Sequence, residues 1–262
     1  MLQFLPISIK IYLSVLTALL GLVMGSALNC LSLRLAAGKK WSGKERSVCA
    51  VCGHTLGTLD LIPLVSWLCL RGKCRYCGEK ISPRYPLTEA LLAFVYVSLL
   101  WRFDLSIHTV CVAVLCSCLF CLSLVDLETQ IIPDRFLVIP AVVRIIELLF
   151  EGGISALLGG IWPGLVIGGG VLVLSLIMDK VLGKDTMGGG DIKLLAVLGM
   201  FLSFPECLLM VVFACVIGIV MASVLMKLDS ETAFPFGPAL SIAAWLTLLF
   251  GNGIIGWYLG LF

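Results

Sequence analysis

Two pairs of cysteines carry the plainest chemical signal in the sequence. They are Cys49-x-x-Cys52 and Cys74-x-x-Cys77, with residues 53–73 between them. Each Cys-x-x-Cys turn directs two sulfurs to one side, so two such turns supply the four soft ligands of a tetrahedral metal ion. Zinc fits this donor set best, although tetrahedral iron or a pair of redox disulfides would suit the same spacing. We therefore expect Cys49, Cys52, Cys74 and Cys77 to form a closed structural Zn2+ site.

Two aspartates at the edges of apolar segments form a second group. Asp126 closes one such segment, and Asp191 follows Gly188-Gly189-Gly190 and precedes the apolar run 194–202. A carboxylate at the edge of a bilayer costs free energy, so both positions suggest a function. Two carboxylates at one depth can share a proton and act as base and acid on one water, as in aspartic peptidases. The simpler interpretation of Asp191 is a carboxylate that caps a helix.

Three further acidic residues compete for a role in chemistry. Asp134 follows Pro133, and this order is typical of the start of a helix. Glu147 follows Arg144 by three residues, so we expect an ion pair on one helix face. Glu89 lies in an apolar run with no evident local partner. We treat it as a candidate functional acid of unknown role.

The elements that must position these residues are membrane helices. Of the 262 residues, 60% are hydrophobic and 13% are charged, unlike soluble domains. The candidate spans are residues 11–35, 86–101, 108–125, 136–150, 157–178, 194–204, 206–226 and 239–261. The first lacks a basic start and a small-residue cleavage site, so we expect a retained anchor and not a signal peptide. The predicted fold is an all-α polytopic membrane protein of about eight transmembrane helices with a small cytoplasmic zinc-binding module.

Basic residues predict the orientation of these helices. Basic residues outnumber acidic ones between the first two spans, and they include Lys39, Arg71, Lys73, Arg75 and Lys80. Loops with an excess of lysine and arginine are retained in the cytoplasm. A reducing compartment also keeps thiols available as metal ligands. If the loops alternate sides, both aspartates lie at the cytoplasmic face as well. A net charge of +2 without a basic and aromatic pattern gives no reason to expect nucleic-acid binding.

Six ordered segments resemble one family, the type IV prepilin leader peptidases. They are Gly25-Ser26-Ala27-Leu28-Asn29, Asp60-x-x-Pro63-x-x-Ser66, residues 71–77 continuing through 81–89, Asp126 with Ile132-Pro133-Asp134, Gly188-x-Gly190-Asp191-Ile192-Lys193, and Pro235-Phe236-Gly237-Pro238. The resemblance covers nearly the whole chain. One departure is Ala50, where the family often has proline after the first cysteine.

The resemblance implies a membrane aspartyl endopeptidase that removes the leader from type IV pilin-like precursors, in pilus or type II secretion systems. It assigns catalysis to Asp126 and Asp191, with Gly188, Gly190, Pro133 and Asp134 as supporting residues. Many members also methylate the new N-terminus with S-adenosyl-L-methionine as donor. No Gly-rich fingerprint marks a donor site, so Asn29 and Glu89 are only candidates for binding it.

The implied domains are a first transmembrane helix at 1–36, the zinc module with methyltransferase-associated motifs at 37–84, and a peptidase core at 85–262. The implied location is the bacterial inner membrane, with the zinc module and the active site on the cytoplasmic side. Peptidase activity without methylation is one alternative. A non-enzymatic zinc-ribbon scaffold is a second, and it would leave the aspartates without a role. A thiol oxidoreductase that adds Cys111, Cys116, Cys118 and Cys121 is a third.

Overall fold

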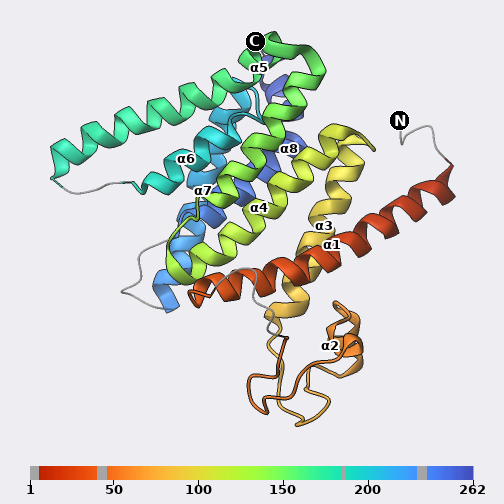
Figure 1. Ribbon diagram of the computed structural model, residues 1–262. Helices are drawn as coiled ribbons and strands as arrows, with labels where there is room; N and C mark the ends of the chain where they lie inside the picture. The colour runs from red at the N-terminus through yellow and green to blue at the C-terminus, as the bar shows by residue number, and fades with distance from the viewer. Residues whose placement is uncertain (1–5, 40–45, 184–186, 229–234, 262) are drawn as a thin grey trace. The chain divides into compact units, whose positions relative to one another are not determined.

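The computed structural model describes residues 6–39, 46–183, 187–228 and 235–261, and for residues 225–228 it describes the backbone alone (Figure 1). The helices are α1 (Ile7–Ala36), η2 (Thr58–Leu61), α2 (Val65–Cys69), α3 (Arg84–Phe103), α4 (Ile107–Thr129), α5 (Arg135–Leu182), α6 (Gly189–Leu198), α7 (Phe204–Leu228) and α8 (Gly237–Leu259). Within these described ranges, extended pairing is limited to two single bridges, Val48 with Thr55 and Lys73 with Lys80. The all-α prediction is confirmed.

Six of these helices are long and apolar enough to cross a membrane, namely α1, α3, α4, α5, α7 and α8, so the protein is a multi-pass membrane protein. The spans expected at 136–150 and 157–178 are both contained in α5, whose backbone leaves helical geometry at Gly152 and Gly153. The span expected at 194–204 corresponds to α6 and the turn after it. A ten-residue helix measures about 15 Å, half the hydrocarbon core. The predicted count of about eight is therefore approximate.

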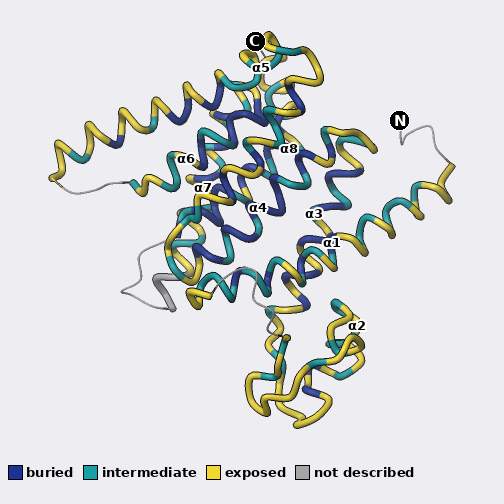
Figure 2. The backbone as a smooth tube through the Cα atoms, viewed as in Figure 1, coloured by how far each residue is buried: buried dark blue, intermediate teal, exposed yellow. Residues whose placement is uncertain are grey.

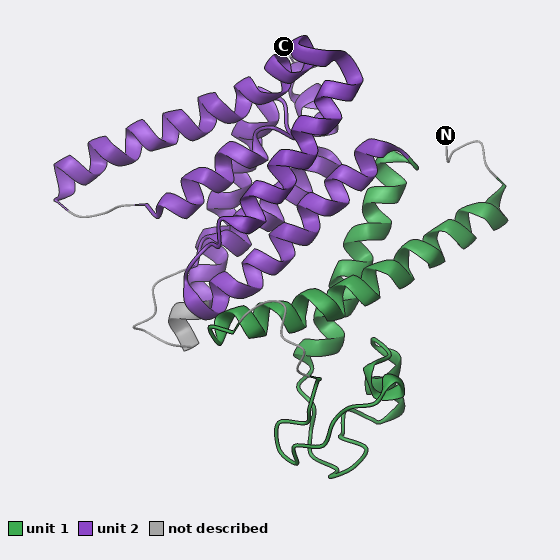
Figure 3. Ribbon diagram, viewed as in Figure 1, with its two compact units in different colours: residues 1–105 green, residues 106–262 purple. Residues whose placement is uncertain are grey.

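The chain divides into two compact units, residues 1–105 and residues 106–262 (Figure 3). The first unit contains α1, the cysteine module and α3. The second contains α4 to α8. The functional domains expected at 1–36, 37–84 and 85–262 stay a prediction, and residues 40–45 of the expected module lie outside the described ranges.

In the first unit, glycines bring α1 and α3 into close antiparallel contact. A Cβ on Gly21 would lie 2.5 Å from Cα of Ala93, and a Cβ on Gly25 would lie 2.9 Å from Cα of Glu89. As residue numbers rise along α1, the contacting residues on α3 have falling numbers, so the two helices are antiparallel. Small residues at such positions let membrane helices pack through their backbones. This packing fixes the face of α3 that carries Glu89.

In the second unit, α4 is the most deeply buried span and packs against α5 and α8 (Figure 2). The short α6 packs against the second half of α5, where a Cβ on Gly168 would lie 2.7 Å from Cβ of Ala196. Gly199, directly after α6, lies equally close to the backbone of Gly164. These contacts hold α6 against α5, and α6 begins with the segment that contains Gly190 and Asp191.

A buried ion cluster joins α4 to α5. Arg144 Nη1 donates to Glu147 Oε2 at 2.6 Å, which confirms the expected pair, and His108 Nδ1 lies 2.8 Å from Glu147 Oε1. The Glu147 side chain is 1% exposed. A carboxylate removed from water in this way needs such partners to offset its lost hydration. The cluster thus accounts for Glu147 structurally and leaves it outside the catalytic candidates.

Candidate active site and metal centre

Asp126 lies at the buried end of α4 against the start of α8. Its side chain accepts a hydrogen bond from the backbone N–H of Gly237 at 3.0 Å, and the residue is 4% exposed. The free N–H groups and dipole of a helix N-terminus stabilise a negative charge placed there. A Cβ on Gly237 would lie 2.7 Å from Asp126 Oδ2, so only glycine leaves room for the carboxylate.

Gly237 is a site residue to which the sequence alone assigned no role. The segment Pro235-Phe236-Gly237-Pro238 gives the available signal, because proline in the first turn favours a helix start and exposes the N–H groups of that turn. The identity of the acceptor is a long-range fact of the fold. Only the folded chain brings Asp126 to this helix end.

Asp191 lies in the first turn of α6, and its environment differs from that of Asp126. The residue is partly buried, and its Oδ1 atom is enclosed with no hydrogen-bond partner among the described residues. Gly188 is the N-cap residue of α6, so Asp191 does not occupy the capping position itself, but it is the acidic residue of the first turn, where the helix dipole favours a carboxylate. Burial and, second, the charge of Asp126 raise the pKa of Asp191 to about 6. The two carboxyl groups therefore interact electrostatically.

The supporting residues connect the two aspartate segments. A Cβ on Gly190 would lie 3.0 Å from Cβ of Ile132, which directly precedes Pro133. Lys193 Nζ and Asp134 Oδ1 form an exposed ion pair at 2.8 Å. Asp134 occupies the expected N-cap position of α5, but its side chain makes no cap hydrogen bond. Its carboxylate pairs with α6 instead.

The four cysteines of the module converge. Their Sγ atoms all lie within 4.8 Å of one another, and those of Cys49 and Cys77 are 3.9 Å apart. A tetrahedral zinc ion with Zn–S bonds of about 2.3 Å requires sulfurs about 3.8 Å apart, so the donor set fits that ion. Backbone N–H groups of Cys52 and Val51 lower the pKa of Cys49 to about 6, whereas burial and the three neighbouring thiols, acting against the N–H of Glu79, raise the pKa of Cys77 to about 12. The convergence of the four sulfurs is therefore what supports a metal site.

Glycines and one aspartate shape the two cysteine turns. Gly53 and Gly78 have φ of 70° and 75°, and their N–H groups donate to the carbonyls of Cys49 and Cys74. The turn after Cys49 forms with Ala50 in place of proline. Asp60 accepts from Arg75 Nε at 2.7 Å and from the Tyr76 hydroxyl at 3.2 Å, which ties the helical turn η2 to the second cysteine pair.

Asn29 and Glu89, the candidates for binding a methyl donor, both lie in the α1–α3 interface. Asn29 is fully buried, and both polar atoms of its amide group lack a hydrogen-bond partner among the described residues. Glu89 is 6% exposed, and its Oε2 atom accepts from the N–H of Leu64 at 2.6 Å. Both residues are buried polar groups, and Ser32 of α1 and Thr88 of α3 are buried as well.

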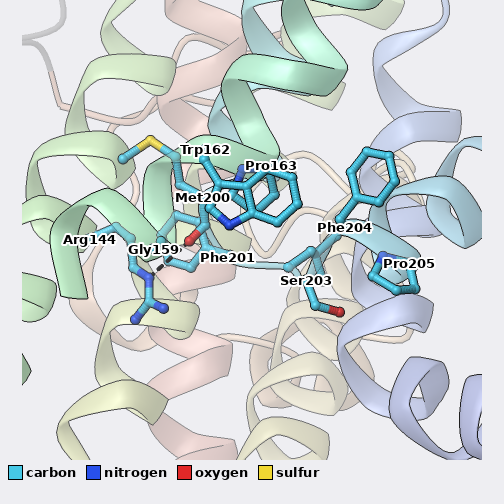
Figure 4. Close-up of a pocket in the computed structure, with 11 residues that line it drawn as sticks. Arg144, Gly159, Trp162, Pro163, Met200, Phe201, Ser203, Phe204 and Pro205 are labelled. Atoms are coloured by element: carbon cyan, nitrogen blue, oxygen red, sulfur yellow. Dashed lines mark hydrogen bonds between the residues drawn. The ribbon is translucent and has the colours of Figure 1, made fainter. Parts of the chain in front are cut away.

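A cavity of about 510 Å³ lies elsewhere in the second unit, between the two halves of α5 and the turn after α6 (Figure 4). Its lining includes Trp162, Phe201 and Arg144, whose Nε donates to the carbonyl of Met200 at 3.0 Å. Neither Asp126 nor Asp191 lines it. The candidate catalytic carboxylates therefore stand apart from this cavity.

Comparison with known proteins matches both parts of the chain. Residues 19–103 match the bacterial peptidase A24 N-terminal domain, and residues 113–223 match the type IV leader peptidase family. A protein named prepilin leader peptidase/N-methyltransferase from Stutzerimonas stutzeri is 34% identical over 92% of this chain and 91% of its own length. A protein of the same name from Aeromonas hydrophila is 38% identical over 82% of this chain and 74% of its own length. Another, from Neisseria gonorrhoeae, is 31% identical over 93% of this chain and 94% of its own length. No solved structure matches the chain.

Proposed function

Because the chain belongs to the type IV leader peptidase family, we propose that it removes the leader from type IV prepilin-like precursors and then methylates the new N-terminus. The observation that carries the peptidase part is the placement of two carboxyl groups in the second unit: Asp126 accepts from the N–H of Gly237 at the start of α8, and Asp191 has an enclosed oxygen with no partner among the described residues. Burial and the charge of Asp126 also raise the pKa of Asp191 to about 6. The methylation part is supported by the names of the relatives, which match nearly the whole chain.

The two carboxyl groups divide the work of peptide hydrolysis. Asp126, at the N-terminus of α8, carries the charge and takes a proton from a water molecule. Asp191, partly buried near that charge, donates its proton to the scissile carbonyl oxygen as the water oxygen adds to the carbonyl carbon. When the diol collapses, Asp126 passes the proton taken from water to the leaving amine, and Asp191 takes back a proton from the hydroxyl that becomes the new carbonyl. Gly188 and Gly190 keep side chains away from this turn, and Lys193 pairs with Asp134 at its exposed edge.

The cysteine module supports a structural Zn2+ ion. Four thiolates complete a tetrahedral shell and leave no position for a catalytic water, so zinc would supply folding free energy to the module. S-adenosyl-L-methionine would supply the methyl group. Asn29 and Glu89 lie in the same compact unit as the module, and this supports their place in the methylation site.

The excess of basic residues in the module supports a cytoplasmic location for the zinc site and for both aspartates, in the bacterial inner membrane. The precursor's apolar helix would then lie in the bilayer beside the enzyme's spans, with the scissile bond at the cytoplasmic boundary. Depth in the membrane would select the bond.

The direct test is incubation of the purified full chain with a prepilin, followed by mass spectrometry with and without S-adenosyl-L-methionine. Loss of the leader, followed by a gain of one methyl group only when the donor is present, is the expected result. An intact precursor in the presence of folded, zinc-loaded protein would contradict the peptidase assignment.

A further inference from the structure

The polar groups in the α1–α3 interface are more than the packing of two apolar helices requires. Asn29 is fully buried, both polar atoms of its amide lack a hydrogen-bond partner among the residues that the structure describes, and the desolvation of each atom costs free energy. One hydrogen bond to Leu64 leaves most of the acceptor capacity of the Glu89 carboxylate unused. Buried polar groups of this kind normally have partners. The pair therefore indicates a ligand with hydrogen-bond donors.

The helix register places Asn29 and Glu89 one turn apart on facing sides of the two helices. Gly21 packs on Ala93, and Gly25 packs on Glu89, so each turn toward the end of α1 meets a turn nearer the start of α3. Asn29 follows Gly25 by four residues on the same face of α1. The side chain of Glu89 leans toward the N-terminus of its own helix, which is the direction of Asn29.

A strained turn covers the same place. Leu64 has φ of 60° and ψ of −49°, and Val65 donates its N–H to the carbonyl of Pro63 at 2.6 Å, so these residues form a γ-turn of the rare positive-φ type. Leu64 points its own N–H at Glu89. A non-glycine residue held in this region costs free energy and is found mainly where function requires it.

We propose that Glu89, Asn29 and the Leu64 turn form a binding site for an α-ammonium group, and that its occupant is the amino terminus released by cleavage. A carboxylate and an amide oxygen are acceptors for the N–H donors of such a cation, and the amide NH2 of Asn29 is left to bind a peptide carbonyl. This inference rests on the proposed function, because it identifies the acceptor site for methylation.

The site also gives methylation its proton acceptor. Glu89 takes one proton from the bound ammonium, which leaves a neutral amine with a free lone pair. That lone pair forms the N–C bond to the methyl carbon of the sulfonium donor, and the electrons of the broken C–S bond stay on sulfur. The methylated product carries the positive charge as a secondary ammonium, and Glu89 later returns its proton to water.

The test measures binding to the full chain in detergent, without a methyl donor. The ligand is a peptide that already begins at the residue after the scissile bond, with its amine either free or acetylated. The wild type should bind the peptide with the free amine at least about tenfold more tightly than the acetylated peptide, because a charge-assisted hydrogen bond is worth at least that ratio of affinities. Glu89→Gln should bring the ratio close to one. Glu79→Gln, the same change at an exposed site in this unit, should leave the ratio intact.

A second variant separates binding from folding. Asn29→Leu has a similar branched shape and removes both unpaired polar atoms, so its melting temperature should match or exceed that of the wild type while the preference for the free amine falls. A lower melting temperature together with an unchanged preference would show that Asn29 is a packing residue and would overturn the proposal.

Two further arms identify the occupant and isolate the inference. Binding of S-adenosyl-L-methionine alone, which also carries an α-ammonium group, is measured for each variant. Loss of donor binding with an unchanged peptide preference in Glu89→Gln would assign the site to the donor and overturn the peptide assignment. If Glu89→Gln keeps both the binding of S-adenosyl-L-methionine and the preference for the free peptide amine, the proposed site itself is overturned. The peptide is already cleaved, so a failure of the peptidase assignment would leave these results unaffected.

Discussion

At the scale of single residues, Asp126 and Asp191 are chemically unequal although their side chains are identical. Asp126 receives an N–H from the first turn of α8, whereas Asp191 has an enclosed oxygen with no partner among the described residues. Unequal environments are what a pair of carboxyl groups needs to act as base and acid. The first two predictions follow from this difference.

Asp126→Asn and Asp191→Asn should each reduce leader cleavage by about a thousandfold or more, because neither half of the proton transfer can be replaced by an amide. Asp134→Asn should be far milder, since it breaks only an exposed ion pair with Lys193, worth about 0–1 kcal/mol. Mass spectrometry of a prepilin time course measures all three. Near-normal cleavage by either dyad variant that inserts and retains zinc would contradict the assignment.

The stability of the protein should depend on the titration of Asp191. Its pKa is raised from 3.8 to about 6 in the folded protein, so the folded state binds this proton more tightly than the unfolded chain does. The resulting stabilisation is complete below about pH 4 and is lost as the pH rises through about 6. Asp191→Asn should therefore gain about 1 kcal/mol relative to the wild type between pH 4 and pH 8, after allowance for partial exposure. Thermal melting of Asp191→Asn and of the wild type at the two pH values measures this gain. An equal change in stability of the two proteins between these pH values would contradict the prediction.

At the scale of elements, the N-terminus of α8 positions one catalytic candidate. Gly237→Ala would place a Cβ 2.7 Å from Asp126 Oδ2, so we expect cleavage to fall by about tenfold or more as the carboxylate moves. Gly253→Ala is the matched control, because Gly253 lies on the same helix and a Cβ there would meet nothing within 4 Å. The control should cleave normally and gain about 0.5–1 kcal/mol of stability. Equal activity of the two variants would remove Gly237 from the site.

The cysteine module is the element that depends on metal. Cys52→Ser, or zinc removal by a chelator, should loosen the turns closed by Gly53 and Gly78 and should impair methylation before peptide cleavage, because the four-thiolate site is structural. Metal analysis and limited proteolysis of the module measure the loss. Active protein with no bound zinc would contradict the prediction.

Local patterns predicted some of these elements and could not predict others. The pair of Arg144 and Glu147 follows from a spacing of three on one helix, but the contact of His108 with Glu147 depends on how α4 packs against α5. Hydropathy predicted separate spans at 136–150 and 157–178, and the backbone of α5 does leave helical geometry between them, at Gly152 and Gly153. Hydropathy alone does not show whether a loop or a kink joins the two halves. The bond from Leu64 to Glu89 joins residues 25 positions apart, and no local pattern marks it.

At the scale of the whole molecule, the proposed function makes the membrane part of the substrate site. Most residues on the second half of α5 are exposed in the isolated chain (Figure 2), and many of them are large and apolar, which suits contact with lipid or with an apolar helix in the lipid. Hydrophobic partitioning would supply much of the non-specific binding of the precursor. The position of the aspartates relative to the bilayer would then decide which bond is cut.

This membrane-depth mechanism predicts how the precursor can be altered. The resemblance to the family implies a glycine directly before the scissile bond. A bulky residue in its place should slow cleavage far more than a change of leader charge does, because the backbone must approach Asp126 and Asp191 closely. A polar insert of several residues between the bond and the apolar helix should also block cleavage, since the bond would leave the level of the carboxylates. The control is an insert of equal length placed before the glycine, which keeps the depth of the bond and should be cut normally. Efficient cleavage of the displaced bond, measured by mass spectrometry in lipid nanodiscs, would show that sequence and not depth selects the site.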